Sequence, residues 1–184
     1  MTRRVAGRWF VVCACLLTFL GSACSPADPP APPPTSSAPT PTENAQEREE
    51  RLAYEAAETS YREFRAEFYR VLGDGGSKSA TASMKKTAAG PYLKEATEVV
   101  QAYRGLRNRT TGSLEISDVR GDGYAPADLI LRACEDSSGV TYYNSKGKVT
   151  GRGELRVVEL TIHDVDGSWK VWSGTGRKVG SCGE

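Results

Sequence analysis

The stretch Gly153–Thr175, GELRVVELTIHDVDGSWKVWSGT, constrains the fold more than any other part of the chain, because it is predicted to form a long β-hairpin. Asp166-Gly167 supplies the turn, and an Asp-Gly pair between alternating apolar residues is the strongest short-range hairpin signal. Pairing outward from this turn places Ile162 opposite Val171 on an apolar face. An isolated hairpin is marginally stable, so other elements of the chain must cover that face.

The two tryptophans of the hairpin are expected to differ in burial. Trp169 pairs with Asp164 and lies on the apolar side, whereas Trp172 lies among polar residues on the other side. Successive side chains of a strand point to opposite faces, so we expect Trp169 to be buried and Trp172 to be more exposed. The alternation changes phase before Val158, and a bulge near Val157-Val158 is predicted to restore one buried face.

The part of the chain before Arg109 has the three- and four-residue spacing of apolar residues that is typical of helices. Asn44 followed by Glu47 resembles a capping box, and it begins a helix that is predicted to end near Leu72. A short helix is predicted over Ser79–Ala89, and Pro91 suits the first turn of a third helix. The buried stripe of the first helix is predicted to consist of Ala53, Ala57, Tyr61, Phe64, Phe68 and Val71.

After Arg109 the spacing of apolar residues changes to two, which is typical of strands. Three strands are predicted before the hairpin, over Ser113–Val119, Ala127–Glu135 and Val140–Asn144. Gly121-Asp122-Gly123 is predicted to form the turn between the first two. Helices followed by antiparallel strands predict an α+β fold, with N-terminal helices packed on a bent antiparallel β-sheet.

The first residues have the layout of an export signal. Three arginines precede an apolar core, Trp9–Leu20, that is too short to span a bilayer comfortably. The small residues before Cys24 resemble a bacterial lipobox, although Gly21 stands where leucine is preferred. We therefore expect residues 1–23 to be a lipoprotein signal peptide, and Cys24 to become the lipid-modified first residue, carrying diacylglyceryl and palmitate groups. The alternative is ordinary signal-peptidase cleavage, which would leave a freely secreted protein.

Residues 24–43 are predicted to be a disordered tether rich in Pro, Ala, Ser and Thr, because proline runs favour extended polyproline II over a packed core. At about 3.1 Å per residue the tether would reach up to roughly 55 Å. It would hold the domain of residues 44–184 on the extracytoplasmic face of the cell membrane. Without residues 1–23 the chain holds 21 basic and 23 acidic side chains, which predicts no nucleic-acid binding and no polybasic membrane patch.

Two cysteines remain after Cys24 in the exported chain. A single disulfide between Cys134 and Cys182 is therefore expected, because exported domains meet an oxidising environment. It would pin a glycine-rich C-terminal tail to the sheet. His163 is the only histidine, and it is predicted to be a solvated strand residue. With one histidine and bridged cysteines, neither a metal site, a cofactor nor a nucleophilic cysteine is expected.

The order of elements and the terminal hairpin resemble the NTF2-like (cystatin-like, SnoaL-like) cone fold over about Gln46 to Cys182. The run from Cys134 to Ser138, together with Gly180-Ser181-Cys182, is similar to small secreted actinobacterial lipoproteins of unassigned function. Enzymes of this fold place an acid or base with tyrosines inside the cone. The resemblance therefore implies that the candidate residues for such a site are Asp128, Tyr61, Tyr103 and Tyr142. They match no family motif residue by residue.

The sequence contains few residues in arrangements typical of catalytic sites, which favours a binding function over catalysis. We expect a membrane-anchored extracytoplasmic lipoprotein that is not an enzyme, and whose cone domain binds an envelope protein or a small hydrophobic ligand. Two alternatives stay open. One is a small pocket enzyme of the isomerase, dehydratase or hydrolase kind, and the other is a surface exclusion or accessory envelope factor.

Overall fold

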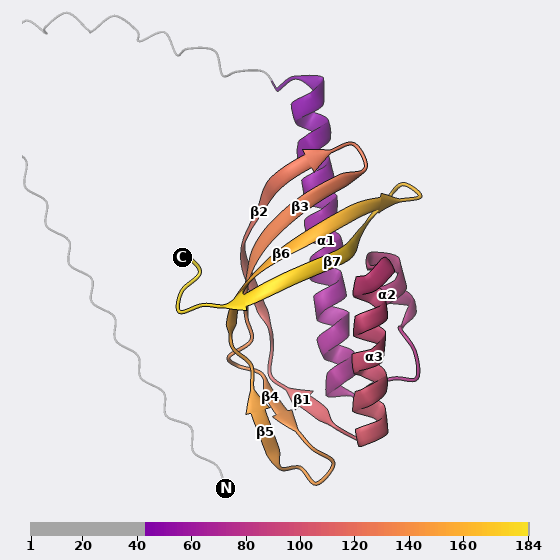
Figure 1. Cartoon of the computed structure of the whole chain (residues 1–184), viewed down its shortest axis with the longest axis vertical. Helices are drawn as coiled ribbons and strands as arrows, with labels where there is room; N and C mark the ends of the chain where they lie inside the picture. The colour runs from indigo at the N-terminus through magenta and orange to yellow at the C-terminus, as the bar shows by residue number, and fades with distance from the viewer. Residues whose placement is uncertain (1–42, 184) are drawn as a thin grey trace, which may run out of the picture. The chain divides into compact units, whose positions relative to one another are not determined.

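The computed structural model describes residues 43–183, and most of the predicted signal peptide and tether, including Cys24, lies outside them. The described residues form three helices followed by seven strands. The α+β fold class predicted from the sequence is confirmed (Figure 1). Among residues 43–183, no helix combines the length and the hydrophobicity that a membrane span requires.

The long first helix, α1, spans Ala45–Gly73. Its predicted capping box is present, because the side chain of Asn44 accepts a hydrogen bond from the backbone of Glu47 and the Glu47 side chain accepts one from Asn44. Helix α2 is limited to Ala82–Thr87, and α3 spans Gly90–Leu106 with a proline in its first turn. The predicted stripe of α1 is buried except for Phe68, which is half-buried at its edge.

The strands form two antiparallel sheets. The main sheet has four strands in the order β2-β3-β6-β7, and the small sheet has three in the order β1-β4-β5. The main-sheet strands are β2 (Glu115–Ala125), β3 (Asp128–Asp136), β6 (Leu155–Val165) and β7 (Ser168–Lys178). Those of the small sheet are β1 (Arg109–Thr111), β4 (Thr141–Tyr143) and β5 (Val149–Arg152).

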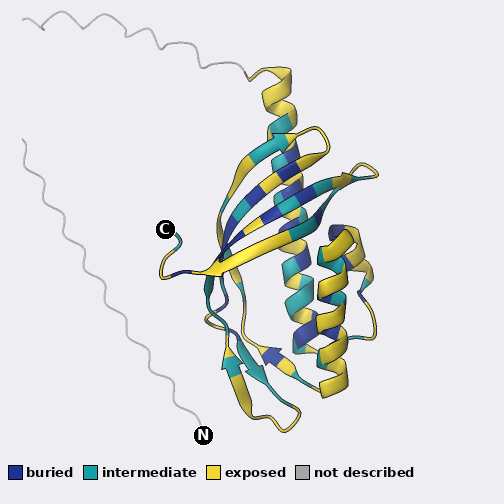
Figure 2. Cartoon of the chain, in the orientation of Figure 1, coloured by how far each residue is buried: buried dark blue, intermediate teal, exposed yellow. Residues whose placement is uncertain are grey.

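The hydrophobic core lies between the helices and one face of the main sheet, as the buried bands on β3 and β6 show in Figure 2. Alternate residues of β3 supply this inner face, among them Leu129 and Leu131. The predicted pairing of the terminal hairpin is confirmed, with Ile162 opposite Val171. Its apolar face is covered by the three helices, as a half-buried hairpin requires.

The bulge predicted near Val157-Val158 is wrong. Strand β6 pairs with β3 without interruption, and the irregularity in the hairpin lies at Thr161/Ile162, where Trp172 is the extra residue of β7. Val157 is buried on the outer face of the sheet, opposite Cys134. The alternation of apolar residues changes phase in β6 because both faces of the sheet are buried where the C-terminal tail covers it. The register of the strands does not shift there.

Trp169 is half-buried and not buried as expected, and Trp172 is half-buried as well. Trp169 packs against the core. Trp172 stacks on His163 with ring centroids 4.8 Å apart, and a Cβ atom on Gly90 would lie 2.7 Å from its indole ring. The bulge in β7 and the start of α3 therefore give Trp172 partners that strand alternation alone does not predict.

Gly121-Asp122-Gly123 is not a turn. These residues continue β2, which runs to Ala125, and the two register shifts of β2 lie beside them. A Cβ atom on Gly121 would lie 2.2 Å from the ring of Tyr54, and the backbone N–H of Gly123 donates to the Tyr54 hydroxyl at 3.2 Å. Gly121 therefore makes room for the α1 tyrosine, and the segment continues the strand instead of reversing the chain.

Candidate functional site

A buried carboxylate lies at the end of the inner face of β3. Glu135 is only 4% exposed, and it follows Leu129, Leu131 and Ala133 on that face. The hydroxyl of Tyr61 on α1 donates a hydrogen bond to its Oε1. The guanidinium of Arg65, one turn further along α1, donates to Oε2 at 2.8 Å, and its Nε lies 2.7 Å from Oε1.

The Nε of Arg65 makes an ion pair but no aligned hydrogen bond in the described structure, so one N–H of this buried guanidinium is unsatisfied. The Arg65 side chain is 14% exposed and that of Glu135 is 6% exposed. Removing two charges from water is costly, and the cost is offset only by close pairing. This pair therefore holds α1 and β3 in one fixed arrangement.

The tyrosines around this pair remain protonated. Burial, and then the negative charge of Glu135, raise the pKa of Tyr61. Burial raises the pKa of Tyr92 on α3 to about 12, although the nearby Arg65 acts in the opposite direction. At neutral pH both phenols are therefore hydrogen-bond donors and not bases.

A groove of about 530 Å³ lies between α1 and the chain segment 110–116, and Arg65 lines it. The groove is thus next to the buried pair, which fixes one of its walls. Its lining contains three arginines, a few apolar side chains and no acidic side chain. The lining residues are Arg62, Arg65, Ala66, Tyr69, Arg70, Gly73, Thr110, Gly112, Ser113, Leu114 and Ile116.

The arginines of the groove are held in place by neighbours. Arg62 donates to Glu58 at 2.7 Å and to the carbonyl oxygen of Ile116 at 2.9 Å, which ties α1 to the opposite wall. Arg70 pairs with Glu67 and Asp74, each at 2.7 Å. The groove therefore presents positioned guanidinium groups beside an apolar wall, a combination suited to a ligand with both apolar and polar parts.

The structure brings some of the predicted candidates to this region. Tyr61 belongs to the buried network. Tyr142, on β4, is hydrogen-bonded to Tyr69 of the groove, and burial raises its pKa. Tyr103 on α3 is half-buried beside the core, and burial raises its pKa as well. None of the three tyrosines lines the groove, although Tyr103 and Tyr142 both lie near Tyr69, which does.

The prediction that Asp128 is an acid inside the cone is wrong. Asp128 opens β3 on the outer face, its side chain is 57% exposed, and its Oδ1 lies 3.4 Å from Nε2 of His163. His163 lies in β6 on the same outer face, where its side chain is 31% exposed and stacks on Trp172. Sequence reasoning missed Glu135, although the alternation of Leu129, Leu131 and Ala133 places the next inward side chain there.

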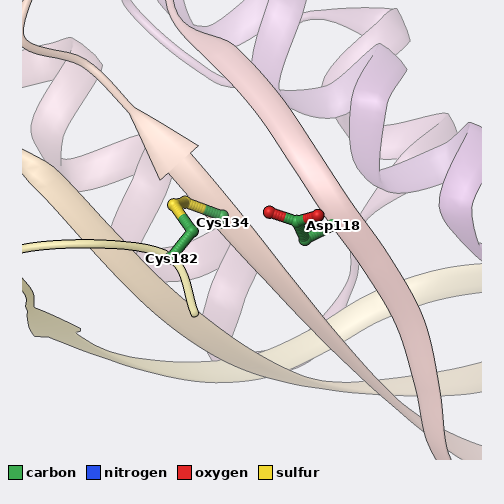
Figure 3. Close-up of side chains that lie close together, drawn as sticks. All are labelled: Asp118, Cys134 and Cys182. Atoms are coloured by element: carbon green, nitrogen blue, oxygen red, sulfur yellow. A yellow bond between two sulfur atoms is a disulfide. The ribbon is translucent and has the colours of Figure 1, made fainter. Parts of the chain in front are cut away.

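Cys134 and Cys182 lie at disulfide distance on the outer face of the sheet, with Cα atoms 5.8 Å apart. Figure 3 shows the carboxylate of Asp118 directed toward them. The carboxylate and the two sulfurs lie within 4.8 Å of one another. A metal ion in such a cluster would need thiolate ligands, and the sulfurs of a disulfide are not thiolates, so this cluster is not a metal site. Cys24 lies outside the described residues, and its lipidation stays a prediction.

No protein-family profile matches the sequence, and no curated protein matches it either. Among solved structures, the intermembrane space region of the chloroplast protein ARC6 is similar over 68% of this chain and 97% of that one, with 9% identity and a TM-score of 0.50. At this identity the likeness shows a shared fold and nothing about activity.

Two further structures carry the NTF2-like name that the sequence resemblance suggested. A candidate dehydratase of the NTF2-like family from Streptomyces avermitilis covers 71% of this chain and 99% of its own, with 12% identity and a TM-score of 0.44. An NTF2-like protein with a cystatin-like fold from Novosphingobium aromaticivorans covers 78% and 96%, with 11% identity and a TM-score of 0.42.

Proposed function

We propose that this protein is a lipid-anchored extracytoplasmic protein whose domain of residues 44–184 binds a small amphipathic ligand without transforming it. The groove beside α1 is the observation that carries the proposal. Its volume, about 530 Å³, lies in the range of small-molecule sites. Leu114 and Ile116 offer apolar contact, while the arginines offer charge-assisted hydrogen bonds to an anionic group.

The surroundings of Glu135 favour binding over catalysis. A general base must reach the proton that it removes, and the oxygens of Glu135 are already engaged by Tyr61 and Arg65 inside the core. The carboxylate therefore serves best as the partner that orients Arg65 in the groove wall. A protein partner remains the other kind of ligand that the anchored domain could take.

The anchoring part of the proposal rests on the sequence alone. Residues 1–23 have the layout of a lipoprotein signal, Cys24 would carry the lipid, and residues 24–43 would act as the tether. If so, the wild-type protein partitions into the detergent phase of a membrane extract, whereas Cys24→Ala is released or keeps its signal peptide. Wild-type protein found only in the culture fluid and without lipid mass would contradict the anchor.

The groove is tested with anilinonaphthalene sulfonate, an amphipathic anion whose fluorescence rises in apolar surroundings. Ala66 lines the groove and is exposed, so Ala66→Trp fills the groove with an indole ring. We expect this change to weaken binding of the probe at least about tenfold, the equivalent of about 1.4 kcal/mol.

Ala102→Trp is the matched control, because Ala102 is an exposed helical alanine on α3 outside the groove lining. Melting curves of both variants exclude a difference in folding. Equal probe binding by the two variants would contradict the groove as the binding site, and so would wild-type protein that does not bind the probe.

A further inference from the structure

The basic side chains of the domain are unevenly distributed. Residues 99–114 and 137–153 hold six basic side chains and no acidic one, whereas the remaining described residues hold 15 basic and 21 acidic side chains. Both basic stretches meet in the small sheet and at the end of α3. The near-zero net charge of the chain therefore hides a strongly basic region, the basic pole. It consists of Arg104, Arg107, Arg109, Lys146, Lys148 and Arg152.

The small sheet presents an uncovered outer face at this pole. Arg109, Tyr143 and Val149 form one row across its three strands. The guanidinium carbon of Arg109 lies 6.0 Å from the Tyr143 ring centroid, so both side chains share a face. The inner side is occupied instead by Thr110, which is buried, and by Tyr142, which bonds to Tyr69.

Within residues 43–183, none of the six basic side chains of the pole forms an ion pair with an acidic side chain. Asp74 shares a hollow with Arg104, Arg107 and Arg109, but its carboxylate is paired with Arg70 at 2.7 Å. All six basic residues are exposed, so they are available to an external anionic surface.

Apolar side chains are exposed among these charges. Val149 is 49% exposed on β5, and Leu106, the last residue of α3, is 63% exposed. Figure 2 shows the end of α3 and the β4–β5 hairpin as largely exposed, and Figure 1 places both at the end of the domain opposite the start of α1. Basic side chains with aliphatic and aromatic neighbours on a projecting edge are typical of surfaces that lie at a membrane interface.

We propose that the basic pole docks on an anionic phospholipid surface. The lysine and arginine side chains would bind the phosphate groups of the lipids, while Val149, Leu106 and Tyr143 enter the headgroup region. A soluble polyanion would use the same charges but would gain little from exposed aliphatic side chains. For this reason the observations favour a lipid surface over an acidic protein or polymer. This inference does not depend on the groove or on its ligand.

The pole would orient the domain on its membrane. Helix α1 has 29 residues and is therefore about 43 Å long, and the tether would join it at the end opposite the pole. A lipid anchor alone would leave the domain free to rotate, whereas contact at the pole would fix which end faces the bilayer. Each basic residue near an anionic surface is expected to strengthen binding about fivefold.

The test uses residues 24–184 with Cys24→Ser, so that no lipid chain contributes. Every residue of the hydrophobic core lies within this piece. The protein is sedimented with vesicles of phosphatidylcholine and with vesicles of equal parts phosphatidylcholine and phosphatidylglycerol. We expect binding only to the anionic vesicles, with an affinity that falls as salt is raised. The triple variant Lys146→Gln, Lys148→Gln, Arg152→Gln is expected to bind about 100-fold more weakly.

The matched control is Lys85→Gln, Lys86→Gln, Lys94→Gln, which removes three exposed charges from α2 and the start of α3. It is expected to lose much less affinity. Val149→Asn keeps every charge and is expected to weaken binding measurably. Equal binding to neutral vesicles, or equal losses in both triple variants, would overturn the proposal. Binding to polyglutamate but not to the anionic vesicles would also overturn it, in favour of a soluble acidic partner.

Discussion

The ion pair between Glu135 and Arg65 provides the sharpest test of how α1 is held on the sheet. Glu135→Gln keeps the shape of the side chain and one acceptor for Tyr61, but it removes the negative charge. Arg65 then remains charged, with its side chain only 14% exposed and its nearest anion gone. Leaving one member of a buried pair unmatched costs about 3–5 kcal/mol.

The structure also supplies a matched surface pair. Arg62 and Glu58 have the same 2.7 Å separation between nitrogen and oxygen, but their side chains are 43% and 37% exposed. Exposed pairs contribute about 0–1 kcal/mol because water and salt screen them. Glu58→Gln should therefore have little effect on the free energy of unfolding, although the nitrogen–oxygen separation is the same.

Urea unfolding at neutral pH measures both changes. For a domain of this size, the loss in Glu135→Gln corresponds to a fall in melting temperature of about 10–20 °C. Replacing both partners, with Glu135→Leu and Arg65→Met together, should restore most of the stability, because no buried charge is then left unmatched. Wild-type stability of Glu135→Gln, or additive losses in the double variant, would refute this account of the pair.

Three further outcomes are expected. Burial raises the pKa of Tyr92 to about 12, so this phenol ionises at lower pH in the unfolded chain than in the folded one. Stability is therefore lost as the pH rises from about 10 toward 12, and Tyr92→Phe should flatten the decline in melting temperature over this range. Cys134→Ser opens a loop with a separation of 48 residues to Cys182 and should cost about 4 kcal/mol in the chain-entropy model, whereas free thiols in the exported protein would contradict the bridge. Gly121→Ala should destabilise the domain by about 1–3 kcal/mol, since its Cβ would overlap Tyr54; adding Tyr54→Ala, followed by thermal melting, should remove the additional strain.

Local signals along the chain were sufficient to predict the main elements. The capping box at Asn44 and the Asp166-Gly167 turn place α1 and the terminal hairpin correctly, because each signal acts between residues close in sequence. The two-residue alternation of Ala127–Glu135 likewise predicts β3 to within a residue at each end. The same alternation, continued past Ala133, would also have indicated an inward Glu135.

Other features depend on contacts between distant parts of the chain. Gly121-Asp122-Gly123 has the composition of a turn but lies within β2, where the ring of Tyr54 on α1 occupies the space beside Gly121 and the Tyr54 hydroxyl accepts from the backbone N–H of Gly123. Val157 breaks the alternation of β6 because the C-terminal tail covers the outer face near Cys182. Neither contact can be identified from residues that are neighbours in sequence.

The order of helices and strands, the pairing of the terminal hairpin and the apolar stripe of α1 follow from the sequence, since periodicity and turn chemistry are local properties. The folded domain was needed to show that Glu135 contacts Arg65 and Tyr61, that a groove forms beside them, and that two basic stretches meet in the small sheet. Burial, ion pairing and surface potential depend on which segments become neighbours after folding. The near-neutral net charge is a sum over all residues, so it does not show where the basic side chains gather.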